Sequence, residues 1–159
     1  MKRTLTASLV VLSLGLGHMG AAQSQKPTPM PYPYSITISS DPHTVKSGSK
    51  ISLDVALKNI LDRRVREPRE VQSLGFKVVV SRAEGDPPAQ TDRGREWNEG
   101  GWVGSGPYIP MEPGATVHRQ IVVSDLYDMA RPGKYLITLL LTYLTQNITS
   151  NTITVTVVH

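Results

Sequence analysis

The chain has 159 residues, of which 17 are Lys or Arg and 13 are Asp or Glu, for a formal net charge of +4. It contains no cysteine, which excludes thiol nucleophiles, thiolate metal sites and disulfide redox chemistry. Two of the positive charges, Lys2 and Arg3, lie in a predicted leader, so the charge left after processing is too small to indicate a nucleic-acid partner.

Residues 1–22 are predicted to be a secretory signal peptide. Lys2 and Arg3 precede an apolar stretch at residues 5–16, and small residues follow up to Ala22. The apolar stretch is shorter than the roughly 20 residues that span a bilayer, and no second run of that length follows. We expect release after Ala22 into the periplasm or medium of a bacterium, with no membrane span afterwards. An uncleaved membrane anchor is the alternative.

Residues 23–34, QSQKPTPMPYPY, are rich in proline and predict an extended, polyproline-like linker. Such segments can also be ligands for aromatic grooves. Residues 35–159 then have the size of one domain, which is long enough to bury a core without disulfides.

Strand patterns fill most of this domain. Apolar residues at every second position predict one face on a core and one face in water. The predicted strands are residues 35–39, 50–58, 76–80, 117–123, 134–143 and 152–158. Residues 134–143 are apolar on both faces, which indicates a central strand, while Arg119 occupies an inward position of its strand. Pro-Gly and Ser-Gly steps between the strands are typical of turns.

No segment has a convincing helical period, although residues 124–130 could form one short helical turn with Ser124 as its N-cap. Residues 82–107 form the one long gap between strands and are expected to be an inserted loop. The pattern as a whole predicts an all-β fold, a β-sandwich of about seven antiparallel strands.

Three segments resemble a known group of domains. They are HTVKSGSKISLDVALKN, MEPGATVHRQIVVSDLYDMARPGKYLITLLL and SNTITVTVV. They are similar to secreted bacterial immunoglobulin-like domains, over roughly residues 34–158 except the middle loop. The resemblance implies an immunoglobulin-like sandwich and says little about function. A fainter similarity is to BsuPI-type proteinase-inhibitor domains.

Tyr135 follows the Pro132-Gly133 turn and opens a strand. Immunoglobulin-like sandwiches use such a tyrosine, whose hydroxyl bonds to nearby backbone, to fix a crossing between sheets. We therefore predict that Tyr135 has a stabilising role.

No catalytic set is recognisable, and we expect a protein that is not an enzyme. His43, His118 and His159 occur without a nucleophile elbow or a paired metal-binding histidine. They are predicted to be surface residues.

No metal or cofactor is predicted. Met30, Met111, His118 and Met129 are the candidates for a copper carrier, but blue-copper geometry needs the missing cysteine. Core packing is the alternative role for the methionines.

Calcium was considered at the acidic residues Asp41, Asp125 and Asp128. They do not form the run of oxygen ligands that calcium needs. Capping and turn formation are the alternative roles.

Residues 61–70, LDRRVREPRE, form an arginine-rich segment with interleaved acids. Guanidinium groups can bind carboxylate or phosphate, but the acids favour a solvated, internally compensated loop.

The middle loop holds the candidate ligand-binding residues. Aromatic and arginine side chains are enriched at binding hot spots. The candidates are Trp97, Trp102, Tyr108, Arg93 and Arg95. The alternative is that the tryptophans pack this loop onto the domain.

The favoured function is a secreted binding or accessory module with a protein or glycan ligand. The alternatives are a proteinase inhibitor that uses the 82–107 loop and a periplasmic copper carrier.

Overall fold

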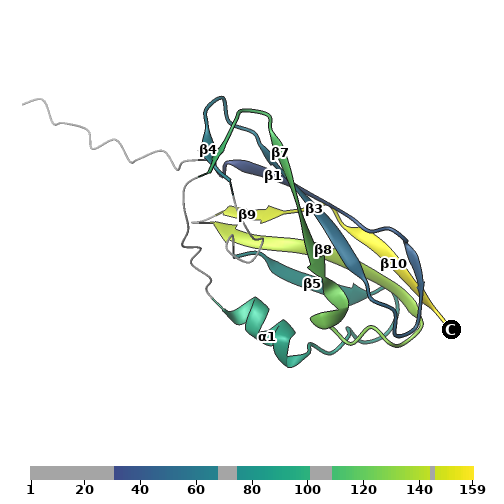
Figure 1. Ribbon diagram of the computed structural model, residues 1–159. Coiled ribbons are helices and arrows are strands. Elements are labelled where there is room, and N and C mark those ends of the chain that lie inside the picture. Colours follow the sequence, from purple (N-terminus) through teal and green to yellow (C-terminus); the bar gives the residue numbers. More distant parts are fainter. Residues whose placement is uncertain (1–30, 68–74, 101–108, 144–145) are drawn as a thin grey trace, which may run out of the picture. The chain divides into compact units, whose positions relative to one another are not determined.

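The computed structural model describes residues 31–67, 75–100, 109–143 and 146–159. These residues contain ten strand segments, one α-helix and one short 3-10 helix, so the prediction of an all-β fold is confirmed (Figure 1). The elements in chain order are β1 (Tyr34–Ser39), β2 (Thr44–Lys46), β3 (Ser52–Asn59), β4 (Val65–Arg66), β5 (Lys77–Arg82), α1 (Asp92–Glu99), β6 (Pro110–Met111), β7 (Thr116–Val122), η2 (Val123–Asp125), β8 (Gly133–Tyr143), β9 (Gln146–Thr149) and β10 (Ile153–Val158).

The first sheet has three antiparallel strands in the order β1-β3-β7. Its strands follow the predicted alternation: Leu53, Val55 and Leu57 are each 0% exposed, whereas Lys58 lies on the opposite face and is exposed. The register places Ile36 opposite Leu57 and, on the other side of β3, Leu57 opposite Val117. Alternation therefore determined both the strands and the face that is buried.

The second sheet has five strands, in the order β2-β10-β8-β5 with β9 also paired to β8. All of its pairs are antiparallel except β10 with β2, which are parallel. β8 lies between β10 and β5, as its two apolar faces predicted. One face is fully buried at Tyr135, Ile137 and Leu139, and the other face is half-buried at Leu136 and Leu140.

The inward residues of both sheets form one continuous core. A third pairing, β4 with β6, closes over one part of it through the buried Met111. Tyr32 and Tyr34, which the sequence placed at the end of a proline-rich linker, are 8% exposed and belong to this core. Tyr32 and Tyr34 of that segment thus pack into the domain. No helix of the described residues is long and apolar enough to cross a membrane.

Three expectations about the chain's elements need correction. Residues 82–107 are not one continuous loop, because α1 occupies residues 92–99. The expected number of strands, about seven, was too low because short strands were not recognised. These strands have two to four residues each, which is too few to show alternation: β2, β4, β6 and β9. The predicted helical turn exists as η2, but its N-cap is Val122, and the Ser124 hydroxyl instead accepts from the Ile51 amide at 3.1 Å.

Tyr135 has the stabilising contact that the sequence predicted. Its ring is 1% exposed, and its hydroxyl donates to the Arg131 carbonyl at 2.6 Å. The guanidinium of Arg82 lies 5.6 Å from the ring centre and donates to the Pro132 carbonyl at 3.0 Å. Gly133 is required there, because its φ is +148° and a side chain would meet Arg82 at 2.9 Å. Tyr135 and Arg82 together fix the turn into β8.

Asn59, at the end of β3, joins three segments of the chain and is 1% exposed. Its side-chain amide donates to the carbonyls of Arg63, Met111 and Glu112 at 2.9 to 3.1 Å, and its oxygen accepts from the Leu61 amide at 3.0 Å. Because a buried backbone group without a partner is costly, these bonds hold the β3–β4 and β6–β7 connections together.

We predict that Asn59→Ala lowers the free energy of unfolding by about 2–4 kcal/mol, because it leaves several buried backbone groups without their partner. Urea unfolding followed by circular dichroism measures the loss. Lys58→Ala, one residue away on the exposed face, is the control and should change stability by less than about 0.5 kcal/mol. Equal effects of the two substitutions would contradict the role assigned to Asn59.

Candidate functional site

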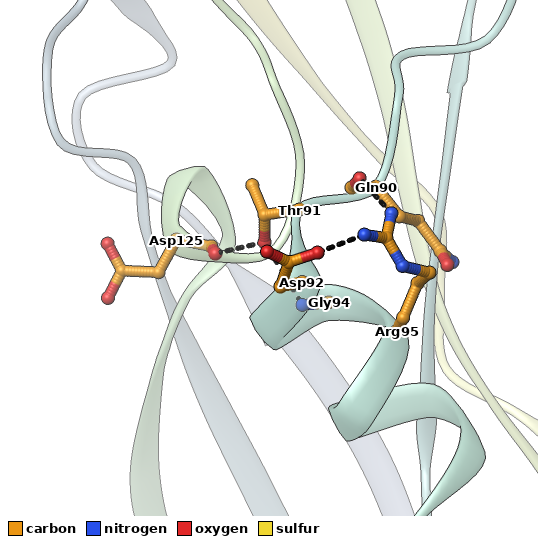
Figure 2. Close-up of polar contacts among 6 residues, drawn as sticks. All are labelled: Gln90, Thr91, Asp92, Gly94, Arg95 and Asp125. Carbon is orange, nitrogen blue, oxygen red and sulfur yellow. Dashed lines mark hydrogen bonds and ion pairs between the residues drawn. The ribbon is translucent and has the colours of Figure 1, made fainter.

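Helix α1 lies in the middle of the segment that the sequence analysis selected, and its first turn is closely bonded (Figure 2). The N-cap is Thr91, whose hydroxyl accepts from the Gly94 amide at 3.0 Å and donates to the Asp125 carbonyl at 2.6 Å. The Thr91 amide donates to the Leu126 carbonyl at 3.0 Å. One threonine therefore caps the helix and also attaches it to η2.

The C-terminal half of α1 is attached to β5 by two neighbouring side chains. Trp97 is half-buried, packs against the core, and donates through Nε1 to the Phe76 carbonyl at 3.0 Å. The side-chain amide of Asn98 accepts from the Val78 amide at 2.9 Å and donates to the Val78 carbonyl at 3.1 Å. Trp97 thus has the packing role that the sequence analysis kept as its alternative to ligand binding.

The two candidate arginines lie on the exposed part of α1. Arg95 forms an ion pair with Asp92 and donates to the Gln90 carbonyl at 3.0 Å (Figure 2). Arg93 is 3.6 Å from the Asp125 carboxylate. Both guanidinium groups remain accessible, with side chains 66% and 52% exposed for Arg93 and Arg95 respectively.

Trp102 and Tyr108 fall outside the described residues. The structure therefore places three of the five candidate residues on α1, and the ligand-binding role of the set stays a prediction.

A groove of about 550 Å³ lies beside the N-terminal end of α1. Three segments form its walls: the β2–β3 turn, the N-cap of α1, and the segment that links β7 to β8. Its lining residues are Gly48, Ser49, Lys50, Thr91, Ser124, Asp125, Tyr127, Asp128, Met129 and Ala130. We call this the end groove.

Hydrogen bonds hold the walls of the end groove in place. The Ser47 hydroxyl donates to the Ala130 carbonyl at 2.5 Å, which ties the β2–β3 turn to the opposite wall. The Asp128 carboxylate accepts from the Ala130 amide at 3.1 Å. The groove thus presents carboxylates, hydroxyls and one lysine on backbone that is already ordered, which lowers the entropic cost of binding.

Sequence reasoning missed the end groove because its walls are short segments far apart in the chain. The only signals were the Lys46-Ser47-Gly48-Ser49 turn and the polar Ser124-to-Asp128 segment, and both were assigned to turn formation. Asp128 does have the expected turn role, as its bond to Ala130 shows.

A smaller pocket of about 150 Å³ lies between Tyr135 and the segment before α1. Its lining includes Arg82, Arg131, Asp86 and Asp128, so its charges are balanced. Arg82 is already bonded to the Pro132 carbonyl and stacked on Tyr135, which indicates a structural role for this guanidinium.

The copper candidates lie in different parts of the fold. Met111 is buried in the core at β6, and Met129 is buried beside the end groove. His118 is exposed on β7, and its Nδ1 lies 2.7 Å from the Asp54 carboxylate. Met30 is outside the described residues. Within the described residues, no group of three or more His, Cys, Asp or Glu side chains is placed to hold a metal ion.

The arginine-rich segment is compensated by residues elsewhere in the chain. Arg64 pairs with Glu112 at 2.6 Å, and Glu67 pairs with Arg119 at 2.7 Å. The second pair explains how Arg119 occupies an inward position of β7, since its partner reaches it across the surface. Arg69 and Glu70 are outside the described residues.

Comparison with known proteins supplies no family for this chain: no protein-family model matches it, and a search of curated proteins gives no match.

Gly94 packs directly against the C-cap of η2, because a Cβ there would lie 2.0 Å from the Leu126 carbonyl oxygen. Alanine is about 1 kcal/mol better than glycine in an isolated helix. We nevertheless predict that Gly94→Ala displaces α1 and destabilises the protein, measured as a lower thermal midpoint and a red-shifted emission of Trp97 in a Trp102→Phe background. Glu96→Ala, at an exposed position of the same helix, is the control. A rise in stability for Gly94→Ala would contradict the close packing.

Trp97 can be observed alone in the Trp102→Phe variant, because the chain has two tryptophans. We predict blue-shifted emission and acrylamide quenching well below that of free tryptophan, since the indole packs on the core and its N–H is bonded. Emission and quenching like those of an exposed indole would show that Trp97 is available to a ligand.

Proposed function

We propose that this chain is a secreted, non-enzymatic binding module with an immunoglobulin-like β-sandwich fold, and that the end groove is its binding surface. The fold proposal is supported by two sheets over one core, by the resemblance of three segments to such domains, and by the Tyr135 hydroxyl bonded to the Arg131 carbonyl. Loops at one end of such a scaffold are the usual place for binding.

The observation that carries the functional proposal is the construction of the end groove. Three bonds order its walls. The Thr91 hydroxyl donates to the Asp125 carbonyl, the Ser47 hydroxyl donates to the Ala130 carbonyl, and the Ala130 amide donates to the Asp128 carboxylate. A preformed groove of about 550 Å³ has the size of a small-ligand or short-peptide site.

The chemistry of the groove favours a polar ligand. The Asp125 and Asp128 carboxylates can accept hydrogen bonds, and Lys50 supplies a cation from the β2–β3 segment. A glycan or a peptide segment of a protein, at the cell surface or in the periplasm, presents matching hydroxyl, amide and carboxylate groups. This is the class of partner that we propose.

We predict that a ligand identified on glycan and peptide arrays loses affinity by about tenfold or more in the double variant Lys50→Ala, Asp125→Asn, since each lost charged hydrogen bond is worth about 1.5–3 kcal/mol. Isothermal titration measures the loss. The matched control is Lys58→Ala, Asp62→Asn, which removes the same kinds of charge from exposed positions outside the groove. Equal affinity of the two double variants would exclude the groove, and turnover of the ligand would exclude a non-enzymatic function.

The proteinase-inhibitor alternative is favoured by a different segment. Residues 83–90 are mostly exposed, contain Pro87 and Pro88, and are bonded at both ends. The Ala83 amide donates to the Lys134 carbonyl at 2.9 Å, and the Asp128 amide donates to the Ala89 carbonyl at 2.9 Å. Helix α1 begins at Asp92, directly after this segment. Within the described residues, the proposed 82–107 inhibitory loop is therefore narrowed to residues 83–90.

Titration against serine, cysteine, aspartic and metallo-proteases tests this alternative. An inhibitor reduces activity stoichiometrically and stays uncut. Loss of inhibition on replacing Asp86 and Pro87 by alanine, with inhibition kept in Lys58→Ala, would support the segment. Rapid cleavage between residues 83 and 90 without inhibition would refute it.

A further inference from the structure

The outer edge of β5, which no described strand pairs with, is where another strand could add to the second sheet. β5 is the last strand in the order β2-β10-β8-β5, so within the described residues only β8 pairs with it as a strand. Val78, Val79 and Val80 give it high β-propensity, and Val79 is 43% exposed on its outer face. An exposed apolar edge strand is a site of association between chains.

Side chains of α1 occupy this edge in place of a strand. Both backbone groups of Val78 are bonded to the Asn98 amide, and the Phe76 carbonyl accepts from Trp97. The Tyr127 hydroxyl adds a second bond to the Val78 carbonyl at 2.5 Å. Residues two apart along an edge strand present their N–H and C=O groups outward, so these bonds use the positions that a neighbouring strand would use.

The cover on β5 differs from the features that protect β1 and β7, the two outer strands of the first sheet. On β1, Asn151 bonds both backbone groups of Ile38, and Asn151 lies directly between two strands, β9 and β10. On β7, the inward charge of Arg119 opposes strand addition. The cover on β5 instead comes from a helix of eight residues that contains Gly94, together with the Tyr127 hydroxyl, which lies outside that helix. Such a helix is below the length of about 12–15 residues that is stable alone.

We propose that α1 is a releasable cover, and that its release allows β5 strands of two copies of this chain to pair antiparallel, edge to edge. The sequence of β5 suits this partner. A two-fold axis at Val79 places Val79 opposite Val79 of the second copy, Val78 opposite Val80, and Lys77 opposite Ser81, with no like charges facing each other. The backbone N–H and C=O of Val78, which Asn98 now occupies, would then bond to the backbone of Val80 in the second copy.

The double variant Trp97→Phe, Asn98→Ala tests the cover by removing the two bonds from α1 to Val78 of β5 and the bond to Phe76, the residue before β5. The bond from Tyr127 to the Val78 carbonyl remains in this variant. We expect its weight-average mass, measured by sedimentation or light scattering, to rise about twofold with concentration over a range where the unaltered protein keeps a constant mass. Val157→Ala, a core substitution in β10, is the control for general destabilisation and should keep a constant mass.

Adding Val79→Lys to the double variant tests the register. Two lysines would then face each other across the closely spaced, non-hydrogen-bonded pair, so the mass should return to that of one chain. A mass that does not rise in the double variant, that rises equally in Val157→Ala, or that Val79→Lys leaves unchanged would overturn the proposal.

Hydrogen exchange on the unaltered protein tests whether α1 is releasable, even if the variants fail to fold. The Val78 amide, bonded to Asn98, should exchange together with the α1 amides and faster than the neighbouring Val79 amide, which points toward β8. Exchange of Val78 and Val79 at one rate, through global unfolding only, would show that α1 is not releasable and would refute the proposal.

Discussion

The fold depends on a single constraint: the backbone groups at strand ends and strand edges must be hydrogen-bonded once water is excluded. Three asparagine side chains provide such hydrogen bonds. Asn98 bonds both groups of Val78 at the edge of β5, Asn151 does the same for Ile38 at the edge of β1, and Asn59 joins the connections around β3. An amide carries both a donor and an acceptor on one short side chain, so it can replace the peptide group of a missing neighbour.

This constraint also links the two surfaces on which the proposals rest. Thr91 caps α1 and bonds to Asp125, which lines the end groove, while Asn98 at the other end of α1 bonds to β5. The eight-residue helix therefore borders the proposed ligand site and covers the proposed pairing edge. A ligand that binds beside Thr91 and orders the start of α1 would also favour the covered state of β5, since both depend on the same helix being in place.

The candidate site was only partly accessible to sequence reasoning. Trp97 was selected from the sequence as a ligand-binding candidate, a role that stays a prediction. Its packing against the core and its hydrogen bond to the Phe76 carbonyl could not be predicted, because they join residues that are not neighbours in the chain. The sequence pattern did not predict α1 because most of its residues are polar and Gly94 interrupts it. Its stability comes from contacts with η2 and β5, which no local pattern records. The end groove was missed for a related reason, since its walls meet only after the sheets have formed.

What the sequence determined by itself were the long strands, their buried faces, the central place of β8 and the Tyr135 contact. These follow from a period of two and from a turn adjacent to a tyrosine, which are local properties of the chain. Only the tertiary structure decided that α1 exists, that Arg119 is tolerated on an inward face because Glu67 reaches it, and that three turns enclose a groove. The physical reason is that each of these depends on bonds between residues distant in sequence, whose free energy is gained only when the two sheets have packed on one core.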